Sequence, residues 1–466
     1  MTVSLPAVQF DSALLRKYDY PVPRYTSYPP ATELKPEFEE IDFRASLAVG
    51  NYKKTPLSLY CHIPFCETPC YFCGCNTVIT QRREISEPYL GYTLRHIRQM
   101  AGLVDRDRRS VNQMHWGGGT PNYLSLDQIE TLWHEITQNF RFEDNAEVSI
   151  EVNPRPLDRE YIRVLRQLGF NRISFGIQDF NPKVQEAINR IQPEETLFNV
   201  MDWVRAAGFE SVNVDLIYGL PYQSLQTFRD TIRKTIKLNP DRIAVFNFAY
   251  VPWLKPIQRR IPQEALPEAS EKLDILKMTI EELTENGYQY IGMDHFAKPN
   301  DELAVAQQQG QLHRNFQGYT TKPESDLVGF GVTSISMLND VYVQNYKRLK
   351  EFYRTIDAGV LPIERGVSLS KEDIIRRTAI MELMCQFQLS KDDLQEKYHL
   401  SFDEDFDEYF FPERSELKRL EADGLVQLSH NHIQVTPIGR LLIRNIAAAF
   451  DAYLRQKITA SFSKGI

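Results

Sequence analysis

Five of the six cysteines in this chain lie in one short stretch, between Cys61 and Cys75. Three of them, Cys66, Cys70 and Cys73, have the spacing CxxxCxxC within the sequence YCHIPFCETPCYFCGCN. Three thiolates on one tight loop can bind three irons of a [4Fe-4S] cluster and leave the fourth iron open. An open iron can bind the amino and carboxylate groups of S-adenosylmethionine. The spacing therefore predicts a cluster that cleaves S-adenosylmethionine to form a radical.

A zinc site and disulfides are the alternatives for such a group of cysteines. Structural zinc takes four protein ligands, often as two separated CxxC pairs. Here the cysteines from Cys66 to Cys75 have no second pair, and only His62 stands nearby. Disulfides are rare in a reducing cytosol, and bridges within so short a loop would constrain little. Cys61 lies in a predicted strand and Cys385 in the helical pattern MELMCQF, so both are predicted to pack as small hydrophobes.

Two motifs after the cysteines follow predicted strands and carry residues that suit the same cofactor. HWGGGTPNYLS (115–125) is a glycine run that allows close backbone approach to the methionyl amino group, and Thr120 adds a polar contact. SIEVNPR (149–155) contains Glu151, whose carboxylate could accept hydrogen bonds from ribose hydroxyls. A tight turn and a salt bridge at the rim of the fold are the structural alternatives for these two motifs.

Three more polar residues stand at or near predicted strands. FGIQDFN (175–181) places Gln178 at a strand end, and the following NRIQ supplies Arg190, whose planar guanidinium suits a carboxylate. Asp215 lies inside the apolar strand VDLIYG. Because charged side chains are rarely buried without a partner, Asp215 implies a polar ligand or an arginine beside it.

The elements that must position these residues alternate between strands and helices from about residue 55 to 340. Strands are predicted at 57–63, 113–119, 147–152, 172–177, 212–219, 242–248 and 288–296. Helices are predicted between them, for example at 158–170 and 269–287, from apolar residues at helical spacing. Such alternation favours an α/β fold with parallel strands and right-handed crossovers, as in a full or partial (β/α) barrel. Ligands of that fold gather at the carboxyl ends of the strands, where the motifs stand.

The C-terminal region differs in character from the rest of the chain. From Ser370 a Ser-x-x-Asp capping signal opens a helix, and the later order of helix, strand, turn, strand and helix is typical of a winged helix. Before the C-terminal region, residues 253–267 are predicted to form a long loop with three prolines, which we call the excursion. Residues 298–325 show no regular pattern. Three regions are therefore predicted: an N-terminal extension at 1–54, the β/α domain at 55–365 and a smaller, mainly helical domain at 366–466.

Composition argues against several classes of protein. The net charge of -8 leaves no large basic field for nucleic acid. The C-terminal domain has only scattered basic residues, such as Arg440, Arg444, Arg455 and Lys457, so a DNA-binding module with a redox-sensing cluster is disfavoured. No apolar run is long enough to span a bilayer, and the N-terminal sequence lacks the pattern of a signal peptide. We expect a cytoplasmic protein without membrane or nucleic-acid partners.

The motifs together resemble the radical S-adenosylmethionine superfamily and, within it, the family of oxygen-independent coproporphyrinogen III oxidases. The similarity covers nearly the whole chain. CxxxCxxC is shared by the superfamily, whereas the GCN after it, GMDHFA (292–297) and HRNFQGYTT (313–321) are typical of this family. PRYTSYPPA (23–31), HWGGGTP, EVNPR, FGIQDFN, DLIYGLP and RLLIRNI match as well. The haem-chaperone branch typically lacks the cysteine that matches Cys75 and the sequence HRNFQGYTT.

The resemblance implies ligands, cofactors and a fold. The cluster would be bound by Cys66, Cys70 and Cys73, while Cys75 would not be a ligand. Two S-adenosylmethionine molecules are implied. The first would contact Tyr60, Gly118, Glu151 and Ile335. The second would contact Phe72, Gly119, Thr120, Gln178, Arg190, Asp215 and Ala249. The implied fold is an incomplete β/α barrel with an added C-terminal helical domain.

The implied reaction converts two propionate side chains of coproporphyrinogen III to vinyl groups, giving protoporphyrinogen IX for haem. An electron donor such as flavodoxin or ferredoxin would reduce the cluster, and the chain is expected to be a monomer. Arg24, Arg190 and Arg314 are candidate partners for propionates, because guanidinium groups pair well with carboxylates. The segments Arg24–Tyr28 and His313–Tyr319 are expected to help cover the radical site. A paralogue with another substrate, or a haem carrier, is the alternative.

Overall fold

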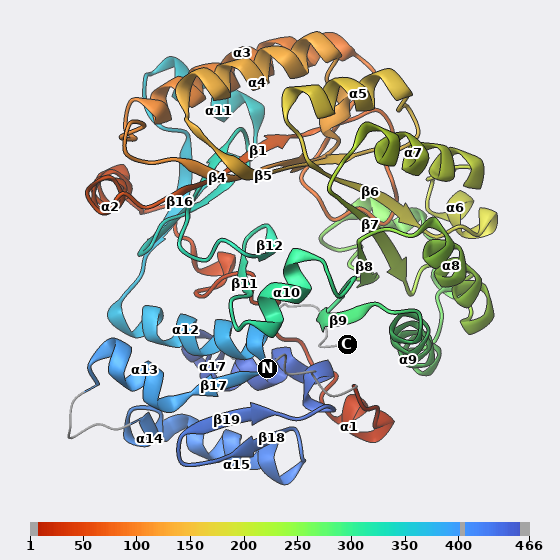
Figure 1. The fold of residues 1–466 in the computed structure, drawn as a ribbon, viewed down its shortest axis with the longest axis vertical. Coiled ribbons are helices and arrows are strands. Elements are labelled where there is room, and N and C mark those ends of the chain that lie inside the picture. The colour runs from red at the N-terminus through yellow and green to blue at the C-terminus, as the bar shows by residue number, and fades with distance from the viewer. Residues whose placement is uncertain (1–7, 401–405, 457–466) are drawn as a thin grey trace. The chain divides into compact units, whose positions relative to one another are not determined.

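The computed structural model describes residues 8–400 and 406–456 of the 466-residue chain. The first seven residues of the predicted N-terminal extension, residues 401–405 and the end of the predicted C-terminal domain, including Lys457, lie outside these described residues. The chain forms two compact units. We call residues 34–286 and 324–368 the barrel unit, and the described parts of residues 1–33, 287–323 and 369–466 the terminal unit (Figure 1).

The barrel unit is built on neighbouring parallel strands that alternate with helices. In sheet order the strands are β1 (Leu57–Ile63), β4 (Val111–Gly118), β5 (Phe142–Val152), β6 (Arg172–Gln178), β7 (Ser211–Tyr218) and β8 (Arg242–Asn247). The helices that follow them include α3 (Ser86–Ala101), α4 (Leu126–Asn139), α5 (Arg159–Leu168), α6 (Pro182–Ala187), α7 (Glu194–Ala207), α8 (Leu225–Leu238) and α9 (Ala269–Glu285). They lie on the outer side of the curved sheet (Figure 1). The predicted partial (β/α) barrel is confirmed.

The other edge of this sheet contains strands that the sequence did not predict. β13 (Asp326–Phe330) pairs with β1 in parallel, and antiparallel β14 (Ile335–Met337), β15 (Val341–Asn345) and β16 (Ile363–Ser368) follow. Two further helices, α2 (Glu40–Lys53) and α11 (Leu349–Asp357), belong to this unit. Because the order of this sheet begins at β16 and does not return to it, the described strands form an open barrel.

Local sequence explains where the helices of the barrel unit begin and end. Asp158 precedes α5 and accepts the backbone N–H of Tyr161 at 2.7 Å, as an N-cap residue does. Gly169 ends the same helix with φ 114°, a left-handed conformation that glycine adopts without steric cost. The side chains of Ile162 and Leu165 between these two caps are fully buried, so the predicted amphipathic helix forms as expected.

In the terminal unit, one predicted strand is wrong. The segment 288–296 forms a hairpin of two antiparallel strands, β9 (Gln289–Gly292) and β10 (His295–Ala297), because Gly292 and Met293 turn the chain with positive φ angles of 145° and 52°. The segment 298–325, which showed no regular pattern, contains α10 (Glu302–Gln308) and the antiparallel pair β11 (His313–Asn315) and β12 (Gly318–Thr320).

The C-terminal part of the terminal unit has the predicted small mixed architecture. Ser370 and Asp373 form the expected capping box at the start of α12 (Lys371–Gln386). A three-stranded antiparallel sheet is ordered β17 (Gln388–Ser390), β19 (His432–Val435) and β18 (Val426–Leu428). Its helices are α13 (Lys391–Tyr398), α14 (Phe406–Tyr409), α15 (Arg414–Ala422), α16 (Ile443–Ala447) and α17 (Ala452–Gln456), and α1 (Ser12–Lys17) belongs to the same unit. Within the described residues, no helix has the length and apolarity needed to cross a membrane.

Candidate functional site

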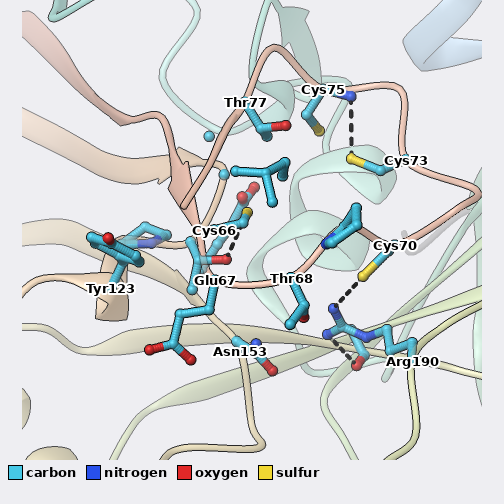
Figure 2. A pocket seen from close by; sticks show the side chains of 18 of the residues that line it. Cys66, Glu67, Thr68, Cys70, Cys73, Cys75, Thr77, Tyr123, Asn153 and Arg190 are labelled. Atoms are coloured by element: carbon cyan, nitrogen blue, oxygen red, sulfur yellow. Dashed lines mark hydrogen bonds between the residues drawn. The ribbon is translucent and has the colours of Figure 1, made fainter. Parts of the chain in front are cut away.

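A cavity of about 750 Å³ opens at the carboxyl ends of β4 to β7 in the barrel unit. Its wall brings together the three cysteines of the CxxxCxxC motif, which lie on one loop around it (Figure 2). Of the cofactor contacts that the resemblance implies, the wall includes Phe72, Gly118, Gly119, Thr120, Glu151, Gln178, Arg190 and Asp215. The position agrees with the general rule that ligands of parallel β/α folds bind at this end of the strands.

The cluster loop, residues 66–77, is fixed to the barrel at its ends and in its middle. β2 (Phe65–Cys66) and β3 (Val78–Ile79) form a short parallel pair, in which Val78 N–H donates to Pro64 O at 2.7 Å. In the middle of the loop, Asn189 Nδ2 donates to Pro69 O at 2.7 Å. These contacts hold the ends and the middle of the loop against the barrel unit.

Each of the three cysteine sulfurs has a different polar neighbour. Cys66 Sγ lies 3.2 Å from Thr120 Oγ1, Cys70 Sγ accepts from Arg190 Nη1 at 3.6 Å, and Cys73 Sγ accepts from the backbone N–H of Cys75 at 3.4 Å (Figure 2). Burial raises the pKa of Cys66 to about 11. Hydrogen bonding from Cys75 lowers the pKa of Cys73 to about 6.

Three cysteine thiols on one loop suit a [4Fe-4S] cluster better than a single metal ion. In the part of the chain that the structure describes, no three His, Cys, Asp or Glu side chains converge closely enough to hold one metal ion. The irons of a [4Fe-4S] cluster occupy separate corners, so thiolates bound to three of them stand apart on one wall. Zinc would require four ligands around one point. The donor set and its spacing therefore fit the predicted cluster.

The glycine run ends β4 directly against the loop that carries the cysteines. A Cβ atom on Gly119 would lie 2.7 Å from Pro64 O, and one on Gly118 would lie 2.8 Å from His62 Cε1. Gly118 also has φ 119°, which side chains rarely tolerate. The sequence explained these glycines by the approach of a cofactor, but the structure shows that the approach of the protein's own backbone already requires them.

Glu151 is held in the cavity by a chain of aromatic and polar groups. His115 Nε2 lies 3.2 Å from Glu151 Oε1, and His115 Nδ1 lies 2.6 Å from Ser149 Oγ. The ring of Tyr60 stacks on His115 at 5.9 Å, and its hydroxyl lies 3.0 Å from His62 Nδ1. Burial raises the pKa of Glu151, but the hydrogen bond and charge of His115 outweigh it and leave the pKa below its usual value. Glu151 is thus an oriented carboxylate.

Three polar side chains on the wall have unused hydrogen-bonding capacity. Among the described residues, Gln178 Oε1 and Arg190 Nε are buried without a hydrogen-bond partner. Asp215 accepts from Asn213 Nδ2 at 2.9 Å, and burial followed by the charge of Glu151 raises the pKa of Asp215 to about 7. Buried polar atoms without partners are costly, so these groups are arranged to meet a polar ligand.

Immediately behind this wall lies a buried polar network in which most groups pair with one another, and Gln192 Oε1 is its one buried side-chain atom without a partner among the described residues. Asp179 is fully buried and accepts from Asn181 N–H at 2.7 Å, Thr231 Oγ1 at 2.7 Å and Gln223 Nε2 at 2.6 Å. Gln185 and Gln192 extend the network, since Gln192 N–H donates to Gln185 Oε1 at 3.0 Å. We call Asp179, Gln185, Gln192, Gln223 and Thr231 the anchor network.

Three of the implied cofactor contacts do not line the cavity. Tyr60 lies behind His115, Ala249 O accepts from Gln258 Nε2 at 3.2 Å, and Ile335 begins β14. Sequence reasoning also missed wall residues. Arg155, in the NPR sequence after Glu151, and Lys255, in the excursion after β8, both line the cavity. A basic residue just after a strand-end motif could have indicated Arg155, whereas nothing in the sequence ties Lys255 to the cysteines.

Fold and site together define a radical S-adenosylmethionine protein. Residues 60–235 match the family described as the Radical SAM superfamily, and residues 369–442 match the HemN C-terminal domain. The oxygen-independent coproporphyrinogen III oxidase of Synechocystis is 64% identical over 98% of both chains, and that of Escherichia coli is 48% identical over 98% of both. The solved structure of coproporphyrinogen III oxidase from Escherichia coli matches with a TM-score of 0.91 and 46% identity, over 96% of this chain and 100% of that chain. The present chain belongs to the oxygen-independent coproporphyrinogen III oxidase family.

Membership in this superfamily implies a [4Fe-4S] cluster and S-adenosylmethionine as cofactors. The wall carries three cysteine thiols of the kind that such a cluster needs, and Glu151, Gln178, Arg190 and Asp215 are charged and polar side chains on the same wall.

Proposed function

We propose that this protein decarboxylates two propionate side chains of coproporphyrinogen III to vinyl groups without oxygen, giving protoporphyrinogen IX for haem synthesis. The observation that carries the proposal is the cavity in which three cysteines of one loop meet buried, unpartnered polar groups. Relatives named oxygen-independent coproporphyrinogen III oxidase match this chain over nearly its whole length.

The chain's own residues would bind, orient and shield the reactants. When bound, the cluster and S-adenosylmethionine supply a 5′-deoxyadenosyl radical, and each decarboxylation then removes one hydrogen atom, one electron and carbon dioxide from a propionate. Glu151, oriented by His115, suits the ribose hydroxyls, and the free hydrogen-bonding capacity of Arg190 suits a carboxylate. The protein contributes position and exclusion of water rather than the radical chemistry itself.

A second S-adenosylmethionine is part of the proposal. The cavity wall contains residues from both implied contact sets, with Gly118 and Glu151 for the first molecule and Gln178, Arg190 and Asp215 for the second. Equilibrium dialysis of the cluster-loaded protein with labelled S-adenosylmethionine should give two molecules bound per chain. One molecule per chain, with Asp215→Asn leaving the stoichiometry unchanged, would restrict the proposal to a single cofactor.

Arg314 is the strongest candidate to bind a substrate propionate. Its side chain is 2% exposed, its guanidinium lies 4.4 Å from the centre of the Tyr319 ring, and Nε and Nη1 have no hydrogen-bond partner among the described residues. Arg24, by contrast, forms an ion pair with Asp294. Arg314→Ala should weaken coproporphyrinogen III binding by roughly tenfold or more while uncoupled cofactor cleavage continues. An unchanged substrate KM would contradict this assignment.

Solvent exclusion and electron supply complete the proposal. Radical chemistry needs a covered site, and we assign the cover to the extension 1–54 and the loop His313–Tyr319. The domain at 55–365 would carry the cofactors, and the domain at 366–466 would complete the fold. Cluster reduction needs an electron donor such as flavodoxin or ferredoxin.

The decisive test is anaerobic turnover of purified, iron-reconstituted protein. Iron and sulfide analysis should find about four of each per chain, as a [4Fe-4S] cluster requires, and coproporphyrinogen III should yield protoporphyrinogen IX and carbon dioxide. The variant Cys70→Ser should lose the cluster, whereas Cys385→Ala, which changes a side chain buried in α12 of the terminal unit, should keep it. Zinc in place of iron, or cluster-dependent cofactor cleavage without decarboxylation, would overturn the proposed reaction.

A further inference from the structure

The excursion after β8 runs along the cluster loop rather than away from it. Lys255 Nζ donates to Cys75 O at 3.1 Å, and Gln258 Nε2 donates to Phe72 O at 3.3 Å. Arg260 Nη1 donates to the hydroxyl of Tyr71 at 3.2 Å. Because Gln258 is only 1% exposed, this attachment is a built contact and not a chance approach of two surface loops.

The outer side of the same excursion is apolar and basic. Trp253 and Leu254 are 67% and 62% exposed, the largest adjacent pair of exposed hydrophobic side chains among the described residues. Arg259 and Arg260 are exposed beside them in the sequence WLKPIQRR, which contains three basic residues and no acidic one. In a chain with a net charge of -8, such a segment stands out. Exposed apolar and aromatic groups with arginines at their edge are the composition of protein-binding surfaces.

The neighbouring part of the cluster loop is also open to solvent. Gly74, Cys75 and Asn76 are exposed, and they follow directly after Cys73. Lys255 joins this stretch to the excursion through its hydrogen bond to Cys75 O. This hydrogen bond brings the exposed part of the loop beside the excursion, next to the cysteines that the proposed cluster uses. We call Gly74–Asn76, Trp253, Leu254, Arg259 and Arg260 the entry surface.

We propose that the entry surface is the docking site for an acidic one-electron carrier protein that reduces the cluster, an inference that rests on the proposed function. Each docking event would oxidise the carrier by one electron and reduce the cluster by one electron, with no bond made or broken. Two features specify the partner. The basic residues attract an acidic protein and speed its encounter, and the apolar pair offers the desolvated centre that a short-lived complex needs.

The test compares a protein reductant with a chemical one, in the absence of substrate. Bleaching of the cluster absorbance is followed by anaerobic stopped flow after mixing with reduced flavodoxin, reduced plant-type ferredoxin, or dithionite. Trp253→Ala with Leu254→Ser, and separately Arg259→Glu, should lower the second-order rate constant with both carrier proteins by about tenfold. Rates with dithionite should stay within about twofold of wild type, because a small reductant needs no docking surface.

Two controls make the result specific. Tyr52→Ala removes another exposed aromatic side chain of the barrel unit, 83% exposed on α2, and should change neither rate. Raising the salt concentration should slow the carrier reaction of the wild-type protein and have less effect on Arg259→Glu, because screening acts on the charges that were removed.

Several outcomes would overturn the inference. They are an unchanged carrier rate in the variants, an equal loss with dithionite, and a wild-type cluster that neither carrier reduces. A raised KM for coproporphyrinogen III in turnover driven by dithionite would assign the surface to the substrate instead. Since cluster reduction is measured without substrate, failure to form protoporphyrinogen IX would count against the proposed function alone.

Discussion

The cavity wall and the anchor network contain similar polar side chains and adjoin at the end of β6, yet their hydrogen bonding differs. On the wall, Gln178 Oε1 and Arg190 Nε have no partner within the described chain, and Asp215 has one close donor, Asn213. In the network, Asp179 alone accepts three hydrogen bonds of 2.6 to 2.7 Å. The two groups meet at consecutive residues, Gln178 and Asp179, at the end of β6.

This difference locates the ligand-binding surface without a bound ligand. A satisfied buried network stabilises and rigidifies a fold, whereas unpartnered buried groups cost free energy until a ligand pairs with them. Gln178 also has φ 66°, a conformation that non-glycine residues adopt at a cost. The network on the far side of the strand end holds this conformation in place, because Gln192 and Gln223 both donate to backbone carbonyls, at Ile177 and Ile217.

The terminal unit repeats the contrast with two buried arginines. Arg376 donates to Glu413 at 2.7 Å, Glu372 at 2.8 Å and Phe450 O at 3.0 Å, so its charge is compensated inside the fold. Arg314 is equally buried but leaves Nε and Nη1 without partners in the described part of the molecule. By the same criterion Arg376 is structural, whereas Arg314 has the unused hydrogen-bonding capacity on which its proposed substrate role rests.

The largest expected effect is a loss of turnover when Arg190 on the cavity wall is replaced. Arg190→Ala removes a guanidinium that is charged in every state, and the loss of its hydrogen bonds to a charged ligand should lower turnover by roughly 100-fold. The free energy of unfolding should fall by only about 1 kcal/mol, because the substitution removes the hydrogen bonds to Cys70 Sγ and Gly176 O, while Nε has no partner to lose among the described residues. The exposed Arg163→Ala is the matched control, and it should alter neither quantity. A large loss of stability in Arg190→Ala would place this residue in the anchor network instead.

The second largest expected effect is a loss of stability when Asp179 in the anchor network is replaced. Asp179→Asn places an amide N–H group against the side-chain N–H group of Gln223, so two donors face each other. The Gln223 amide cannot turn over to relieve this, because its nitrogen donates to Ile217 O and its oxygen accepts from Leu220 N–H. We expect the free energy of unfolding, measured by urea titration of cluster-free protein, to fall by roughly 2–3 kcal/mol. Asp202→Asn, at an exposed position of α7, should have no such effect. If cofactor affinity falls and stability does not, the distinction between wall and network is wrong.

The wall could be predicted from the sequence much better than the network. Glu151, Gln178 and Asp215 stand at or within strands whose apolar pattern is clear, and parallel strands bring their ends together. The partners of Asp179 are long-range, since Thr231 is 52 residues away, and no local pattern pairs them. Lys255 is 180 residues from Cys75, so only the fold shows that the excursion supports the cluster loop.

The errors in the secondary structure have a similar cause. The run 288–296 is rich in aromatic and apolar residues on both sides of Gly292, so its pattern does not show the reversal at Met293. β14 has only three residues, too few for an alternating pattern to emerge. Short strands of this kind form because a neighbouring strand offers hydrogen bonds, and that neighbour is fixed by the tertiary fold.

The smallest expected effect is an increase in the free energy of unfolding, opposite in sign to that of Asp179→Asn, and it concerns Asp215 on the cavity wall. Burial and the nearby Glu151 raise the pKa of Asp215 to about 7, well above the value of an aspartate in the unfolded chain. A raised pKa means that the folded protein binds this proton more tightly, so the stability it contributes is present at low pH and is lost as the pH rises from about 4 through 7. Asp215→Asn should therefore increase the free energy of unfolding of cluster-free protein at pH 8, by about 1–2 kcal/mol.

At pH 4 the difference between Asp215→Asn and wild type should become small, because Asp215 is then neutral in the folded protein and only about half ionised in the unfolded chain. Urea titrations of the two proteins at pH 4, 6 and 8 measure the whole curve. A variant that is less stable than wild type at pH 8 would mean that Asn213 and Arg190 already compensate this carboxylate, and that the wall at Asp215 resembles the network behind it. Replacing aspartate with asparagine should therefore lower the stability at Asp179 and raise it at Asp215. We expect these opposite signs if the wall is built to pair with a ligand and the network is not.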